Sequence, residues 1–243
     1  QGAREAILLR LKELEKEPLR YRYEALFEDD QAKPAQTNLA ARKLLSLDSA
    51  DTLSVFGSAA TALLPQFESQ YPKAFFLAVS AHHEVATGKR SFVFFSSYEG
   101  LANMAIDCVK AKGYKRVAII YGRRRGIQDC SELFISKLPS IGADAVAVAP
   151  FNPGERDFRT ELTRIREAAP DILFILSWMP ECEIIIKRAR ELGIATPLAS
   201  MEAFNYLSDK SIAEGAWYPT GVNWTPDFES RFTAFYNHPP TYA

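Results

Sequence analysis

The segment Gly113-Tyr114-Lys115-Arg116-Val117-Ala118-Ile119-Ile120 decides the fold class of this chain. Its glycine follows a helical pattern and supplies the left-handed backbone conformation that ends a helix at little steric cost. The apolar run at 117–120 has no polar side chain on either face, which is typical of a parallel strand covered on both sides. A helix, a glycine and a buried strand in this order predict a βα crossover.

The same order recurs along the chain. Gly142 and Gly193 also stand between a helical pattern and an apolar run. Repeated crossovers of this kind are right-handed and build a parallel sheet, so we predict an α/β fold. The expected strands are residues 19–27, 53–56, 74–79, 92–95, 116–121, 143–148, 172–176, 198–201 and 215–218, and the expected helices are residues 6–14, 34–47, 59–70, 98–112, 128–138, 156–168, 182–192 and 228–236, with a short one near 206.

A break in this alternation indicates two lobes. The apolar strand expected at 92–95 ends in the polar pair Ser96 and Ser97 before a new helix begins. We therefore expect a first α/β lobe over residues 1–96 plus 223–243 and a second over residues 97–222, each with a parallel sheet. The alternative is one continuous sheet.

The composition excludes several classes of partner. The chain has 243 residues, of which 47% are hydrophobic and 24% charged, as is ordinary for a globular protein. Its 29 Lys and Arg against 30 Asp and Glu give a net charge of −1, so no basic excess favours nucleic acid. The apolar runs are far shorter than the roughly 20 residues of a membrane span, so we expect no membrane insertion.

No motif points to an enzyme, a metal or a cofactor. The sequence lacks G-x-S-x-G, H-E-x-x-H and G-x-x-x-x-G-K-[ST], so we expect no enzyme activity, and the alternative is an α/β enzyme of unrecognised chemistry. His82, His83 and Glu84 are adjacent, but neighbouring side chains on a loop seldom point the same way, so we expect no metal there. The scattered cysteines leave the compartment open and predict neither a metal site nor a full disulfide framework; they are Cys108, Cys130 and Cys182.

The alternation itself predicts where a ligand binds. In open parallel sheets the ligand sits outside the carboxyl ends of the strands, where the loops converge. The small, hydroxyl-bearing loop 57–61 leads into a helix, whose first N–H groups attract a carboxylate, although the loop's alternative role is an ordinary helix cap. The full set of strand-end loops is 57–61, 80–84, 96–99, 122–126, 177–181 and 200–205.

Several segments resemble a known family. Glu-Asp-Asp-Gln at 28–31, the run 113–120, and Phe-Asn-Pro-Gly-Glu-Arg-Asp-Phe at 151–158 look like those of the type I periplasmic binding proteins. More narrowly, they are similar to the branched-chain amino-acid (leucine/isoleucine/valine) binding group of ABC transporters. The segments 170–174, 187–193 and 214–215 strengthen the match, which runs over nearly the whole chain.

The resemblance implies two Rossmann-like lobes that close on a small molecule like a Venus flytrap. It implies a solute-binding protein of the periplasm or extracellular surface, in its mature form without a signal peptide, that delivers an amino acid or a related small carboxylate or amide to an ABC transporter permease. The alternative is a ligand-sensing regulatory domain of the same fold. The family also has an opening strand and closing segments that this chain lacks, so we expect a fragment truncated at both ends whose first lobe misses a central strand.

The resemblance also implies roles for individual residues. The loop after Gly57 would hold the ligand carboxylate, Glu84 and Glu202 would hold the ammonium with two polar residues nearby, and Trp178 would supply aromatic surface. The predicted ligand-binding residues are Ser58, Ala59, Ala60, Thr61, Ser80, His82, Glu84, Arg125, Trp178 and Glu202.

Two of these positions depart from the family pattern. Arg125 stands where the family often has a tyrosine, and Glu84 stands where it has a small hydroxyl residue. Both changes add charge, which favours a more polar or acidic amino acid, an amide or another small carboxylate over a purely aliphatic amino acid. The alternative for the arginine run 123–125 is a solvated surface loop.

Overall fold

The structure, a computed structural model, describes residues 2–31, 33–221 and 225–240. The chain divides into two compact units, one made of residues 1–50 with 222–243 and the other of residues 51–221. The described strands lie in the second unit and form two separate parallel sheets, of three and four strands, rather than one continuous sheet. The lobe boundaries expected from the sequence stay a prediction.

The three-stranded sheet is built from β1 (Thr52–Phe56), β2 (Phe75–Val79) and β3 (Ser91–Val93), in that order. Alternate side chains of β1 and β2 are buried, and α3 (Ser58–Thr61) and α4 (Leu64–Gln70) contact these strands. Several other positions of this sheet are apolar but exposed; they are Phe56, Phe75, Leu77 and Phe92.

The four-stranded sheet has the order β5-β4-β6-β7. Its strands are β4 (Arg116–Gly122), β5 (Asp144–Phe151), β6 (Ile172–Leu176) and β7 (Leu198–Ala199). The apolar run at 117–120 is fully buried, as its sequence predicts. Its alternate residues enter two different clusters, because a strand presents successive side chains to opposite faces of its sheet.

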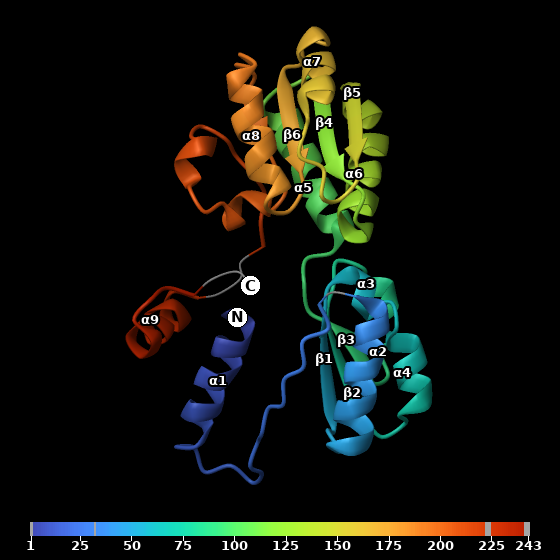
Figure 1. Ribbon diagram of the computed structural model, residues 1–243, viewed down its shortest axis with the longest axis vertical. Helices are drawn as coiled ribbons and strands as arrows, with labels where there is room; N and C mark the ends of the chain where they lie inside the picture. The colour runs from blue at the N-terminus through green and yellow to red at the C-terminus, as the bar shows by residue number, and fades with distance from the viewer. Residues whose placement is uncertain (1, 32, 222–224, 241–243) are drawn as a thin grey trace. The chain divides into compact units, whose positions relative to one another are not determined.

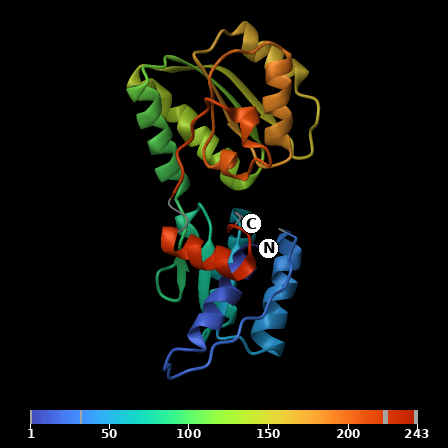
Figure 2. The ribbon, with the colours of Figure 1, turned by 90° about the vertical axis from the view of Figure 1, so that its left-hand side faces the viewer.

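Helices cover both faces of this sheet (Figures 1 and 2). Val117 and Ile119 pack with α5 (Tyr98–Ala111) and α6 (Arg125–Lys137), whereas Ala118 and Ile120 pack with α7 (Arg159–Glu167) and α8 (Glu181–Glu191). The neighbouring strands β4 and β6 therefore continue into helices on opposite faces. Such a divergence opens a crevice at the carboxyl ends of the two strands, where α/β proteins bind ligands.

The smaller unit is helical in its described residues. It contains α1 (Gly2–Leu14), α2 (Pro34–Arg42) followed by a π-helical turn (Lys43–Leu47), and α9 (Pro226–Tyr236). Helices α1 and α9 contact each other through a hydrogen bond from Tyr236 Oη to the Glu5 carbonyl oxygen (2.9 Å) and an ion pair between Arg231 and Glu13. Across the described residues, every helix falls short of the length and apolar character needed to cross a membrane.

Some sequence expectations were wrong. Residues 19–27 form no strand, and their side chains Tyr21 and Tyr23 are exposed. A strand gains its backbone hydrogen bonds from a neighbouring strand, and none of the described strands pairs with this segment. The helix expected at 59–70 divides into α3 and α4, because Pro65 occupies the first turn of a new helix, where its missing N–H costs nothing. Among residues 215–218, where a strand was expected, the structure has only an isolated parallel β-bridge between Trp217 and Ala199.

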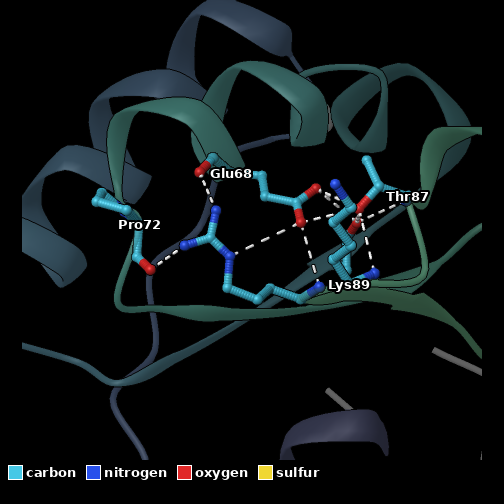
Figure 3. A network of polar contacts seen from close by, with 6 residues as sticks. Glu68, Pro72, Thr87 and Lys89 are labelled. Atoms are coloured by element: carbon cyan, nitrogen blue, oxygen red, sulfur yellow. Dashed lines mark hydrogen bonds and ion pairs between the residues drawn. The ribbon is translucent and has the colours of Figure 1, made fainter.

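A buried glutamate fixes the turn between β2 and β3. Figure 3 shows the Glu68 carboxylate, on α4, accepting hydrogen bonds from the hydroxyls of Thr87 (2.8 Å) and Ser91 (3.0 Å) and from the backbone N–H of Arg90 (3.2 Å). The Arg90 guanidinium donates to the carbonyl oxygens of Glu68 (2.7 Å) and Pro72. The Thr87 hydroxyl, followed by the other donors, holds the pKa of Glu68 below its ordinary value against the opposing effect of burial.

Replacing Glu68 by Gln should lower the free energy of unfolding at pH 7 by about 1–3 kcal/mol, because buried donors lose their charged acceptor. The folded-state pKa lies below the ordinary 4.5, so this contribution is complete above pH 4.5 and is lost as the pH falls through the lowered value. Urea unfolding of both proteins over this range measures the effect. The exposed Glu214→Gln is the control, and equal stability of Glu68→Gln and wild type at pH 7 would contradict the assignment.

Candidate functional site

The candidate site begins at the carboxyl ends of β1 and β2. Gly57 follows β1 with φ = 89°, a conformation that favours glycine, and its N–H donates to the Val79 carbonyl oxygen at 2.9 Å. This turn leads directly into α3, which contacts β2. Sequence reasoning placed a ligand-binding loop at this turn.

Three predicted site residues form a hydrogen-bonded series there. Thr61 Oγ1 lies 3.0 Å from Ser80 Oγ and 3.0 Å from the Gly57 carbonyl oxygen. Ser80 Oγ in turn accepts the backbone N–H of His82 at 3.1 Å. Thr61, Ser80 and His82 are all buried, so the series is shielded from solvent.

The imidazole of His82 links this series to the helices of the four-stranded sheet. Its Nε2 lies 2.5 Å from Asp129 Oδ2 on α6, and its ring centroid lies 5.0 Å from that of Tyr98, the first residue of α5. Burial, followed by the carboxylates of Glu84, Glu99 and Asp129, raises the pKa of Tyr98. Sequence reasoning missed Asp129, because a single aspartate on a helix forms no recognisable motif.

A glycine permits close contact between α3 and α6. A Cβ at Gly126 would lie 2.8 Å from Ser58 Oγ and 3.4 Å from Ser58 Cβ, the first of which is shorter than real Cβ contacts allow. Gly126 therefore lets the loop after β1 approach the start of α6. This contact and the His82–Asp129 contact join the elements around the two sheets.

Glu202 brings a buried carboxylate to the end of β7. It is 5% exposed, and burial raises its pKa, partly offset by a hydrogen bond from the Gly221 N–H. Its φ of 62° is uncommon for a residue with a side chain. A buried carboxylate with a raised pKa on a strained backbone is typical of a functional site.

Sulfur atoms connect Glu202's loop to α6. Cys130 follows Asp129, and its Sγ lies 3.4 Å from Met201 Sδ. Burial, followed by the charges of Glu202 and Asp129, raises the pKa of Cys130 to about 12, so the thiol stays protonated. The position of Cys130 brings the loop after β7 close to the His82–Asp129 contact.

The loop after β6 carries Trp178. Its ring is half-buried and packs edge-on against Tyr206 at a centroid distance of 5.0 Å. The adjacent Glu181 is buried, and its Oε1 accepts hydrogen bonds from Gly154 N (2.8 Å) and Arg124 Nη2 (3.4 Å). Burial acts to raise the pKa of Glu181, but these donors outweigh it and hold the pKa below its ordinary value. Glu181 thereby ties the loops after β4, β5 and β6 together.

Other predicted residues lie at different depths. Ala59, Glu84 and Arg125 are exposed, Ala60 is buried and Ser58 is half-buried. The structure thus brings four predicted residues into one connected group: Ser58, Thr61, Ser80 and His82. The pair Cys130–Met201 links this group to the loop of Glu202. The other predicted residues are not joined to it. The ligand-binding role of every one of these residues stays a prediction. Within the described ranges, no group of three His, Cys, Asp or Glu side chains could hold a metal ion.

Two parallel sheets with buried polar groups at their strand ends are typical of α/β binding proteins. The family described as Periplasmic binding protein matches residues 1–242, and the chain belongs to this family. The resemblance deduced from the sequence and the predicted fold class are therefore confirmed.

Curated relatives are distant. An amino acid binding protein of Pseudomonas aeruginosa is 23% identical over 203 residues, covering 80% of this chain and 53% of that protein. A Leu/Ile/Val-binding protein of Citrobacter freundii is 26% identical over 99 residues, covering 41% of this chain and 27% of that protein. The chain thus spans about half the length of the first of these relatives and less of the second.

Solved structures share the fold. The branched-chain amino acid binding protein LivJ of Streptococcus pneumoniae, in complex with isoleucine, has a TM-score of 0.83 at 16% identity, covering 98% of this chain and 73% of that chain. A solute binding protein of an ABC transporter from R. palustris, in complex with benzoate, has a TM-score of 0.83 at 13% identity, covering 98% and 70%. At these identities the likeness shows the fold alone.

The α3–α6 contact predicts a coupling between Gly126 and Ser58. Alanine is about 0.8–1 kcal/mol better than glycine inside a helix, so Gly126→Ala should stabilise α6 unless its methyl group meets Ser58. We expect Gly126→Ala to be clearly less favourable with Ser58 present than in a Ser58→Ala background, by about 0.5–3 kcal/mol. Denaturant unfolding of the four proteins measures this coupling energy, and strictly additive effects would show that the two positions do not touch.

Proposed function

We propose that the chain acts as an extracytoplasmic solute-binding protein. It captures a small amino-acid-like ligand at the strand ends of its two sheets and delivers it to the permease of an ABC importer in the periplasm or at the extracellular surface. Its membership of the family supports this proposal. The observation that carries the ligand class is the buried carboxylate of Glu202, whose pKa is raised by burial.

An amino acid has two opposite charges that the site can receive separately. The ammonium group would lie against Glu202, and its positive charge would offset the cost of burying that carboxylate. The carboxylate would lie against the hydroxyls of Ser58 and Thr61 and the N–H groups of the turn after Gly57. Trp178 would cover the apolar part of the ligand between these two ends.

The exposed charges at the same loops widen the proposed ligand class. Glu84 and Arg125, both exposed, add one negative and one positive charge to the strand-end loops. A polar or acidic amino acid, an amide or a related small carboxylate therefore fits the proposal as well as an aliphatic amino acid does. The ligands of two structurally similar proteins, isoleucine and benzoate, differ in this respect, since only isoleucine carries an ammonium group.

Calorimetric titration with the twenty standard amino acids tests the proposal. We expect one or more to bind at roughly micromolar strength, or about −8 kcal/mol. Glu202→Gln keeps the shape of the side chain and removes its charge, so it should weaken binding of that amino acid at least about tenfold. The exposed Glu214→Gln should leave binding unchanged. Absence of heat with every amino acid would refute the proposed ligand class.

Glu202→Gln should also stabilise the ligand-free protein. Because burial raises the folded-state pKa of Glu202 above the ordinary 4.5, the ionised group destabilises the fold increasingly as the pH rises above 4.5. We therefore expect Glu202→Gln to raise the free energy of unfolding at neutral pH by about 0.5–2 kcal/mol, and to have little effect below pH 4.5. Urea unfolding across the pH range measures the difference, and a destabilised variant at neutral pH would contradict the burial argument.

A further inference from the structure

The second ring nitrogen of His82 has no partner. The side chain is 2% exposed, and Nδ1 is buried without a hydrogen bond to any described residue. The other nitrogen, Nε2, lies 2.5 Å from Asp129 Oδ2. Buried polar atoms of folded proteins nearly always have partners, so an unpaired ring nitrogen beside a candidate binding site points to a ligand.

Asp129 determines which nitrogen carries the proton. An ionised carboxylate only accepts hydrogen bonds, so Nε2 must carry its hydrogen to make the contact with Asp129. In the neutral ring Nδ1 then holds a lone pair and accepts. The aspartate of a Ser-His-Asp triad orients its histidine in the same way.

The surroundings of the ring also favour a ligand that donates. The ring lies against Tyr98, whose pKa is raised in part by the carboxylates of Glu84, Glu99 and Asp129. These acidic groups attract an N–H donor. The backbone N–H of His82 is already bound to Ser80 Oγ, so Nδ1 is the polar atom of His82 for which the described residues provide no partner.

We propose that Asp129 is a specificity-determining residue, which holds His82 as a hydrogen-bond acceptor so that the site selects ligands with an N–H donor. The donor is an ammonium or a carboxamide group, and small carboxylates without such a group bind poorly. This inference rests on the proposed function and adds to it a residue, Asp129, that acts on the ligand through His82.

Nitrogen-15 spectra of the imidazole test the first step on the unaltered protein. We expect Nε2 to be protonated and Nδ1 to be unprotonated in the ligand-free chain. A protonated Nδ1 would overturn the proposal. This measurement also decides the proposal if the Asp129 variant does not fold.

Calorimetry with matched ligands tests the second step. The probes are L-leucine and L-glutamate, their donor-free analogues 4-methylpentanoate and glutarate, and the amide 4-methylpentanamide, which separates an ammonium from a carboxamide donor. We expect a donor-bearing probe to bind at least about tenfold more tightly than its donor-free analogue. The Asp129→Asn side chain no longer fixes which ring nitrogen of His82 carries the proton. It should therefore reduce about tenfold the ratio of affinities between a donor-bearing probe and its donor-free analogue. Glu132→Gln, an exposed carboxylate on the same helix, is the matched control.

The outcomes distinguish the two proposals. Equal binding of donor-bearing and donor-free probes, or a loss in Asp129→Asn no larger than in Glu132→Gln, would overturn the role of Asp129 alone. Absence of binding by every probe and every standard amino acid would overturn the proposed ligand class and this inference with it.

Discussion

The pairing of β4 with its two neighbours is the constraint on which the rest of the larger unit depends. β4 lies between β5 and β6 in parallel register, and its residues 117–120 are inaccessible to solvent. Fully burying a Val or Ile side chain contributes about 1.5–3 kcal/mol, and alternation along the strand divides this burial between two helical layers. The helices that follow β4 and β6 lie on opposite faces, so the loops leading to them separate at the carboxyl ends of these strands.

The elements around this sheet were predictable because their signals are local and redundant. A strand buried on both faces needs a continuous apolar run, and 117–120 and 172–176 supply one without help from other segments. The segment 19–27 alternates apolar and charged residues over most of its length, yet it forms no strand, since a strand is stabilised by hydrogen bonds that its own sequence cannot provide. Local pattern therefore predicts a strand only where a partner strand exists.

The candidate site was predictable only in part. The turn at Gly57 and the loops after β2 and β7 follow from the rule that ligands bind at strand ends, and the resemblance to a family identified Thr61 and Glu202 there. Asp129 could not be found in this way, because its significance arises from a contact with a residue 47 positions earlier in the sequence. Nor does the sequence show that Glu84 and Arg125 are exposed while Thr61 and Ser80 are buried. These are properties of packing between elements, which no local pattern records.

Two buried glutamates illustrate how structure separates a structural role from a functional one. Glu68 and Glu202 are almost equally buried, but Glu68 meets two hydroxyls and a backbone N–H, and its pKa is lowered. Glu202 accepts a hydrogen bond from the backbone N–H of Gly221, and burial raises the pKa of its carboxyl group. A carboxylate whose charge the fold already satisfies gains little from a ligand, whereas one that the fold leaves under-satisfied gains the most from a cation. In the proposed function, a ligand that donates N–H hydrogen bonds would offset the cost of burying Glu202.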